Sequence, residues 1–257
     1  MAELDGRPVT LDEMQALALT NYGSFTTLRV EGRRVRGLGL HLERLADDCR
    51  ALFGVGLDQG YVRGLMRRMA PPEGTATIRV TVFDPATDLG RPEHAPDPHV
   101  LVTRRPAGPL PLPALSVKSA RYERDVPGVK NVGLFGALWH RRAARLDGFD
   151  DVLFVDDRGA ISEGCTWNIG FYDDGGIVWP AAKALPGVTM RLLQTHHPHR
   201  TAEVRPADLP AVRAAFATNA AIGVRAVTRI DDTEFPAAHP ILDTLREEYA
   251  ALPGEPL

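Results

Sequence analysis

Apolar residues recur at three- and four-residue steps in two early stretches of the chain, and this spacing predicts helices there. The stronger pattern covers residues 41–53, and Gly54 follows it where a C-terminal cap belongs. Its apolar positions are Leu42, Leu45, Ala46, Cys49, Leu52 and Phe53. Residues 61–69 repeat the pattern more weakly. Strands are predicted where Val, Ile and Thr are concentrated, over residues 25–30, 77–83 and 99–103. These elements predict a small α+β domain over residues 1–105.

A run of prolines separates this predicted domain from the rest of the chain. Pro106, Pro109, Pro111 and Pro113 lie within eight residues, and neither a helix interior nor a central strand accommodates such a run. Because proline-rich segments act as stiff spacers, residues 106–115 are predicted to form an interdomain linker.

Beyond the prolines, short apolar segments alternate with turn signals. A helix is predicted over residues 134–146, ending at Gly148, and another begins at Thr189. Strands are predicted over residues 152–155, 161–163, 168–172, 177–179 and 215–217. The first four of these strands are expected to form a meander. The whole pattern predicts a larger domain over residues 116–257, and so a two-domain α/β (α+β) chain.

Lysine is rare in this chain, which narrows any chemistry that needs an amine. Lysine and arginine total 30 residues, but only Lys118, Lys130 and Lys183 are lysines. Lys130 enters an apolar helix without a flanking acid, and a desolvated lysine loses its proton more easily and becomes a usable nucleophile. The competing interpretation is a solvated lysine at a helix start. Lys118 and Lys183 are weaker candidates.

Four other residues have both a structural and a functional interpretation. Glu163 ends a predicted hairpin strand, where it is either a solvated strand end or a partner for a cationic ring nitrogen. Thr189 begins a helix, where free N–H groups favour an anion, although an N-cap hydroxyl explains it equally well. Asn219 follows a buried strand, either as a polar turn or beside a ligand. Arg44 would usually lie on the solvated face of its helix.

The bulk composition excludes several classes of protein. The formal net charge is -3, and 44% of the residues are hydrophobic. The chain has no block of basic residues suited to binding the phosphate backbone of a nucleic acid, so no nucleic-acid partner is expected. No apolar stretch is long enough to span a bilayer, and the first residues are acidic, so a cytoplasmic protein is predicted. Cys49 and Cys165 are isolated, and the spacing of His196, His197 and His199 fits no common zinc pattern, so no metal site is expected.

A series of short motifs occurs in order along the chain. The series is His41-x-x-Arg44-Leu45, Lys130 before a helix, Asp150-Asp151-Val152-Leu153-Phe154-Val155-Asp156, Gly159-x-x-x-Glu163, Asn168, Leu185-Pro186-Gly187-Val188-Thr189 and Thr218-Asn219-Ala220. In order and approximate spacing it resembles the class IV aminotransferase family. This family is the fold type IV group of pyridoxal phosphate (PLP) enzymes, which contains branched-chain and D-amino acid aminotransferases and aminodeoxychorismate lyase. The resemblance covers nearly the whole chain.

The resemblance implies a two-domain fold that holds PLP between its domains, usually in a homodimer. Lys130 would form the Schiff base, and Glu163 would face the pyridinium nitrogen. The residues that would bind the phosphate are Arg44, Val188 through its backbone N–H, and Thr189. Asn219 and Ala220 would lie in the loop that contacts phosphate or substrate carboxylate, and Arg79 matches a position near the substrate carboxylate in branched-chain relatives.

The implied activity is transfer of an amino group between an amino acid and a 2-keto acid through a Lys130 aldimine. One alternative is a lyase that releases pyruvate and 4-aminobenzoate from aminodeoxychorismate, because both reactions share removal of the Cα proton. Another is a PLP-fold protein that has lost catalysis and serves as a binding subunit. Phe25-Thr26-Thr27 and Leu134-Phe135 depart from the usual Phe-Glu-Thr and Asn-Tyr of relatives, which affects specificity more than cofactor chemistry.

Overall fold

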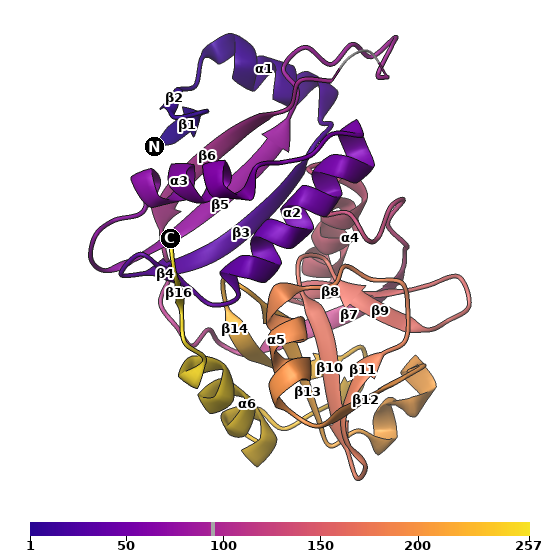
Figure 1. Ribbon diagram of the computed structural model, residues 1–257. Helices are drawn as coiled ribbons and strands as arrows, with labels where there is room; N and C mark the ends of the chain where they lie inside the picture. Colours follow the sequence, from indigo (N-terminus) through magenta and orange to yellow (C-terminus); the bar gives the residue numbers. More distant parts are fainter. Residues whose placement is uncertain (94–95) are drawn as a thin grey trace. The chain divides into compact units, whose positions relative to one another are not determined.

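The computed structural model describes residues 1–93 and 96–257, and the chain divides into two compact units (Figure 1). Unit 1 comprises Met1–Gly108, Val129–Gly133 and Pro253–Leu257. Unit 2 comprises Pro109–Gly128 and Leu134–Leu252. The chain therefore leaves unit 1 within the proline-rich stretch, and the short segment that carries Lys130 belongs to unit 1.

Unit 1 is built on a seven-stranded antiparallel sheet with the order β16-β4-β3-β5-β6-β1-β2. Its strands are β1 (Ala2–Leu4), β2 (Arg7–Pro8), β3 (Ser24–Glu31), β4 (Arg34–Val35), β5 (Thr75–Phe83), β6 (His99–Pro106) and β16 (Glu255–Pro256). Its helices are α1 (Leu11–Thr20), α2 (Leu38–Phe53) and α3 (Gln59–Met69). The three strands and two helices predicted for this region are confirmed.

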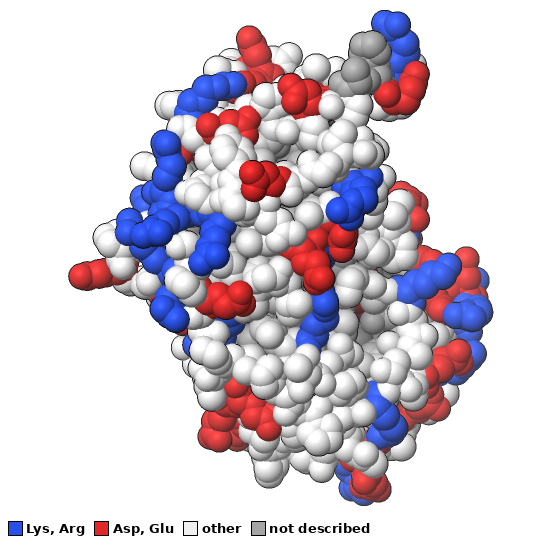
Figure 2. All heavy atoms as spheres, viewed as in Figure 1, with Lys and Arg blue, Asp and Glu red and all other residues white. Residues whose placement is uncertain are grey.

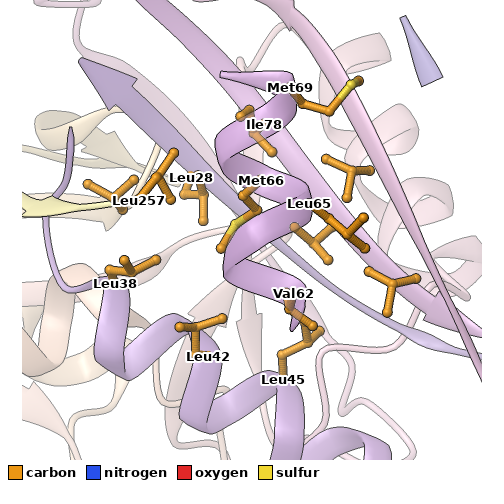
Figure 3. Packing of buried hydrophobic residues seen from close by; sticks show 14 of the residues in the cluster. Leu28, Leu38, Leu42, Leu45, Val62, Leu65, Met66, Met69, Ile78 and Leu257 are labelled. Carbon is orange, nitrogen blue, oxygen red and sulfur yellow. The ribbon is translucent and has the colours of Figure 1, made fainter. Parts of the chain in front are cut away.

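The apolar faces of α2 and α3 form the core of unit 1 with one face of the sheet. Figure 3 shows side chains from both helices meeting Leu28 of β3, Ile78 of β5 and the C-terminal Leu257. Gly54 ends α2 in the left-handed conformation with φ 71°, as the cap signal predicts. Figure 2 shows basic side chains gathered over α3 and β4, so α3 turns its arginines to solvent and its apolar residues to the sheet.

Helix α1 is absent from the sequence prediction, and its burial pattern explains why. None of its residues is buried, so no hydrophobic stripe marks it. A local signal defines its start instead: Glu13 N–H donates to the Thr10 hydroxyl, and the Glu13 carboxylate accepts from Thr10 N–H, which together form a capping box.

Unit 2 is built on a nine-stranded mixed sheet with the order β12-β11-β10-β13-β14-β7-β8-β9, with β15 paired to β14. Its strands are β7 (Leu115–Arg121), β8 (Asp151–Val155), β9 (Ile161–Gly164), β10 (Asn168–Asp173), β11 (Gly176–Pro180), β12 (His199–Ala202), β13 (Ala214–Asn219), β14 (Gly223–Ile230) and β15 (Thr233–Glu234). Its helices are α4 (Phe135–Leu146), α5 (Val188–His196), α6 (Pro240–Ala251) and the 3-10 helix Pro206–Ala211.

The predicted meander is confirmed, because β8, β9, β10 and β11 pair antiparallel in sequence order. The pairing of β9 with β10 also joins the two ends of the run β10-β13-β14-β7-β8-β9, so six strands form a closed ring. Closure leaves these strands without free edges. The cluster that packs on them includes Val117, Leu153, Trp167 and Phe171. The mixed α/β fold class expected from the sequence is confirmed.

Candidate active site

Lys130 lies in unit 1, in the segment Val129–Gly133 beside β3, and its main chain is held on two sides. Phe25 N–H donates to the Lys130 carbonyl at 2.9 Å. The Lys130 N–H in turn donates to Asp48 Oδ2 on α2 at 3.2 Å. The side chain is partly buried, with Nζ 4.9 Å from the centre of the Phe25 ring. Lys130 is therefore not a solvated helix-start lysine, since a strand and a helix both fix its backbone.

Arg44 lies on the buried face of α2, and the solvated-face interpretation is wrong. It is only 7% exposed, and its Nη2 donates to the Thr26 hydroxyl at 2.7 Å. The same hydroxyl lies 2.7 Å from His41 Nδ1. Because Thr26 accepts from Arg44, its own proton is available for His41, which makes Nδ1 the acceptor of a neutral imidazole. Burial, with Arg44 and Lys130 nearby, lowers the pKa of His41 well below its usual value.

Asp48 is a buried carboxylate in the same part of unit 1, only 3% exposed. Burial raises its pKa to about 6, while its hydrogen bond from Lys130 N–H and the charges of Arg44 and Lys130 oppose that rise. Asp48 is a site residue that was not predicted from the sequence. The available signal was its place four residues after Arg44 on a predicted helix, a spacing that puts the two side chains on one face.

Arg79 lies on β5 with its guanidinium 3.6 Å from the centre of the Phe25 ring. Its Nε donates to the Thr81 hydroxyl at 3.3 Å. Burial and the neighbouring Arg105 lower the pKa of Arg79. Within residues 1–93 and 96–257, no carboxylate forms an ion pair with it. A half-buried arginine that stacks on an aromatic ring and has no acidic partner is suited to binding an anion.

In unit 2, Glu163 is buried at the end of β9, so the interpretation as a solvated strand end is wrong. Its Oε2 accepts from Leu185 N–H at 3.4 Å, and its Oε1 lies 3.6 Å from Arg124 Nη1. The two side chains of this ion pair are only 6% and 10% exposed. No spacing in the sequence indicated Arg124, because the pairing depends on how a loop returns to the strand.

Strand register places three polar residues side by side in unit 2. Glu163 of β9 pairs with Asn168 of β10, and Asn168 pairs with Thr218 of β13. Residues directly opposite in antiparallel strands project to the same face, so three motifs that are separate in sequence share one face of the sheet. The Thr218 hydroxyl is buried and has no hydrogen-bond partner in the described part of the chain.

The N-terminus of α5 provides donors for an anion. Gly187 is the N-cap and offers no side chain, so Thr189 is not the N-cap residue. Thr189 is fully buried, and its hydroxyl lacks a hydrogen-bond partner among the described residues. The first turn of a helix presents free N–H groups and a positive partial charge. In α5 these groups include the N–H of Val188, which was predicted to bind the phosphate. Together with the orphaned hydroxyl, these groups fit a phosphate.

Asn219 stabilises a turn with its own side chain. Its Oδ1 accepts from Ala221 N–H at 2.9 Å and Ile222 N–H at 3.1 Å, and its Nδ2 donates to the Thr166 carbonyl at 3.1 Å. The polar-turn interpretation therefore describes its side chain. Asn219 fixes the loop that includes Ala220, so any contact with a ligand from this loop falls to the backbone.

The residues fit the chemical groups of PLP. Lys130 supplies an amine on a fixed backbone, and the buried Glu163 supplies a carboxylate held beside Arg124. The orphaned Thr189 hydroxyl and the first turn of α5 supply phosphate donors. No cluster of His, Cys, Asp and Glu in the described ranges could hold a metal ion, and no helix there is long and apolar enough to cross a membrane.

The comparisons with known proteins identify the family of the chain. Residues 23–230 match the family model described as amino-transferase class IV. The chain therefore belongs to the class IV aminotransferase family, as the order of its motifs predicts. It is 29% identical over 157 residues to a probable branched-chain-amino-acid aminotransferase of Rickettsia bellii. That match covers 58% of this chain and about half (50%) of the relative.

Solved structures share the fold. A branched-chain aminotransferase from Thermoproteus uzoniensis with norvaline superposes with a TM-score of 0.85 at 19% identity, covering 97% of this chain and 93% of that one. The branched-chain amino acid aminotransferase from Escherichia coli gives 0.82 at 19% identity, covering 98% and 93%. A fold IV transaminase from Curtobacterium pusillum gives 0.77 at 22% identity, covering 91% and 86%. At these identities the likeness establishes the architecture.

Replacing Gly187 with alanine tests the anion site at α5. A Cβ at this position would overlap Asn168 Oδ1, whose amide donates to the Leu185 carbonyl at 2.8 Å. Either Asn168 or the first turn of α5 has to move, so we expect affinity for PLP to fall roughly tenfold or more, equivalent to about 1.4 kcal/mol. The dissociation constant of the apoprotein for PLP measures the effect.

Gly64→Ala in α3 is the matched control, because a Cβ there meets nothing within 4 Å. We expect it to bind PLP like the unaltered protein. Equal affinities in the two variants would show that the first turn of α5 does not bind the cofactor.

Proposed function

We propose that this protein is a PLP-dependent aminotransferase that moves an amino group between an amino acid and a 2-keto acid. Membership of the class IV aminotransferase family supports the reaction class. The observation that carries the proposal is in unit 2. There a buried carboxylate, Glu163, occurs together with an anion site at α5 that has an unpartnered buried hydroxyl, Thr189. A pyridinium nitrogen and a phosphate are the two groups that such a pair of sites would bind.

PLP supplies, when bound, an aldehyde that accepts the amino group and a ring that accepts electrons from the substrate Cα. In this proposal Lys130 Nζ would hold the cofactor through its aldehyde, and the amine, once free, would take the proton from the substrate Cα and deliver it to the cofactor carbon that carries the amino nitrogen. Glu163 would hold a proton at the ring nitrogen. Arg44, the Val188 N–H and Thr189 are the residues proposed to bind the phosphate.

The substrate carboxylate is assigned to Arg79 and to the loop that contains Asn219 and Ala220. Arg79 forms no ion pair with an acid of the described chain, and its guanidinium lies 3.6 Å from the centre of the Phe25 ring. Both an amino acid and a 2-keto acid carry a carboxylate, so one cationic site serves both half-reactions. No observation favours lyase activity or an inactive binding subunit. The homodimer and the cytoplasmic location stay predictions.

The test is a donor and acceptor screen on the purified protein with PLP. Amino acids of both hands are paired with 2-keto acids, and formation of the new keto acid and the new amino acid is followed in parallel. We expect the two products in equal amounts from at least one pair. Aminodeoxychorismate is tested separately. Release of 4-aminobenzoate without amino transfer, or protein that stays colourless with added PLP, contradicts the proposal.

A further inference from the structure

Asp48 is an unusual residue for the interior of α2. Its neighbours along the buried face, Leu45 and Cys49, belong to the apolar core of unit 1. A buried carboxylate is normally surrounded by several donors, because burial of a charge without them is costly. Within the described residues the hydrogen bond to the Asp48 carboxylate comes from the Lys130 N–H, 82 positions away in sequence. This carboxylate is therefore directed at the lysine segment.

The adjacent acid on α2 behaves differently. Asp47 has a side chain that is 65% exposed and pairs with Arg50 one turn further along the helix, at 2.9 Å. Two neighbouring acids on one helix thus face opposite environments, and only Asp48 reaches the Val129–Gly133 segment. Asp47→Asn is therefore a matched control, because this substitution removes the same charge from the same helix at a position that does not contact Lys130.

The charges around Asp48 favour its ionised form at neutral pH and above. Arg44 and Lys130 attract the carboxylate charge, and Asp47 repels it weakly. Burial raises the pKa of the Cys49 thiol and lowers the pKa of the His41 imidazole, so both side chains are neutral there. The titratable groups that interact with Asp48 are Arg44, Asp47 and Cys49 from α2 and Lys130 from the loop segment.

We propose that Asp48 is a positioning residue whose ionised carboxylate fixes the main chain at Lys130, and whose protonation releases that segment. Lys130 is held by Phe25 N–H at its carbonyl and by Asp48 at its N–H. Loss of negative charge on Asp48 weakens the second bond, because charge-assisted hydrogen bonds are about twice as strong as neutral ones. The side chain of Lys130 is then attached to a mobile backbone, so its Nζ amine is no longer held in position beside the Phe25 ring. The catalytic consequence rests on the role proposed for Lys130, but the switch itself does not.

Amide hydrogen exchange of the apoprotein tests the switch without cofactor or activity. Protection of the Lys130 amide, corrected for intrinsic exchange, is measured from about pH 5 to about pH 8. We expect roughly tenfold or greater loss of protection as the pH falls through about 6, where Asp48 takes up its proton. The Phe25 amide, which bonds to the Lys130 carbonyl, reports whether the whole segment opens.

The sign of the change separates this switch from global unfolding. The folded-state pKa of Asp48 lies above its usual value of 3.8, so the folded protein binds the proton more tightly than the unfolded chain. This group therefore makes the fold more stable as the pH falls through about 6. Titration of Asp48 therefore cannot cause loss of protection at Lys130 through global unfolding, and a core amide measured in the same experiment reports any change in global stability from other groups.

Two variants complete the test. Asp48→Asn should give low, pH-independent protection at Lys130, and Asp47→Asn should follow the unaltered protein. The proposal is overturned if protection of the Lys130 amide in the unaltered protein does not change with pH, or if the Asp48→Asn variant shows the same pH-dependent change. Should Asp48→Asn fail to fold, the pH profile of the unaltered protein still decides.

A second experiment measures borohydride trapping of PLP on Lys130 as a function of pH. Absence of trapping at every pH would count against the proposed function alone.

Discussion

Replacing Lys130 with alanine is expected to lower amino transfer by about 10³-fold or more, which is the largest effect we predict. The variant loses the amine that binds the cofactor aldehyde and the base that moves the Cα proton. Its backbone hydrogen bonds to Phe25 and Asp48 do not involve the side chain, so we expect the fold to persist. The measurement is kcat for the best donor, together with the visible absorbance of the PLP-loaded protein.

The other two lysines are natural controls for this prediction. Lys118 forms an ion pair with Asp147, and Lys183 lies 3.9 Å from Glu123 with a side chain that is 77% exposed. Alanine at either position should leave the rate and the absorbance within about twofold of the unaltered protein. Borohydride reduction followed by peptide mapping gives an independent answer. A cofactor trapped on Lys118 or Lys183 would overturn the assignment of Lys130.

Glu163→Gln is expected to reduce kcat by about 10²- to 10³-fold, the range seen when one electrostatic group is removed from an active site. Glutamine keeps an oxygen that can accept from Leu185 N–H, but it carries no charge with which to hold a proton on the ring nitrogen. The visible spectrum of the bound cofactor should change as its ring loses that proton. Glu123→Gln, at a more exposed position in the same unit, should change neither the spectrum nor the rate.

The same variant also removes the negative charge from the buried ion pair between Glu163 and Arg124, and this second effect has to be separated from the first. Breaking one side of a buried pair typically costs about 3–5 kcal/mol of stability. The double variant with Arg124→Gln should recover part of that stability but none of the activity. Denaturant unfolding and steady-state rates on both variants separate the two effects. Recovery of the rate along with stability would show that Glu163 acts through folding only.

Local patterns in the sequence were sufficient to predict about half of the individual elements, and helix α6 and strand β14 were among those not predicted. Helix α2 carries a clear three- and four-residue apolar repeat with a terminal glycine, and the meander β8 to β11 is divided by strong turn signals. The scarcity of lysine and the order of the motifs pointed to the family that the comparison confirms. Helix α1 was missed because it buries none of its residues, so its sequence has no periodic apolar stripe.

The identity of the buried charges was decided by tertiary structure. Asp47 and Asp48 are adjacent acids with the same local sequence context, yet only Asp48 meets the Lys130 backbone. Likewise the sequence allowed Glu163 to be a solvated strand end. In the structure it is buried, because β9 pairs with β10 and Arg124 forms an ion pair with its carboxylate. Helix α2, the β8 to β11 meander, the rarity of lysine and the family could all be predicted from the order and spacing of residues along the chain. Burial and charge pairing depend on which distant segments meet, and only the folded chain determines that.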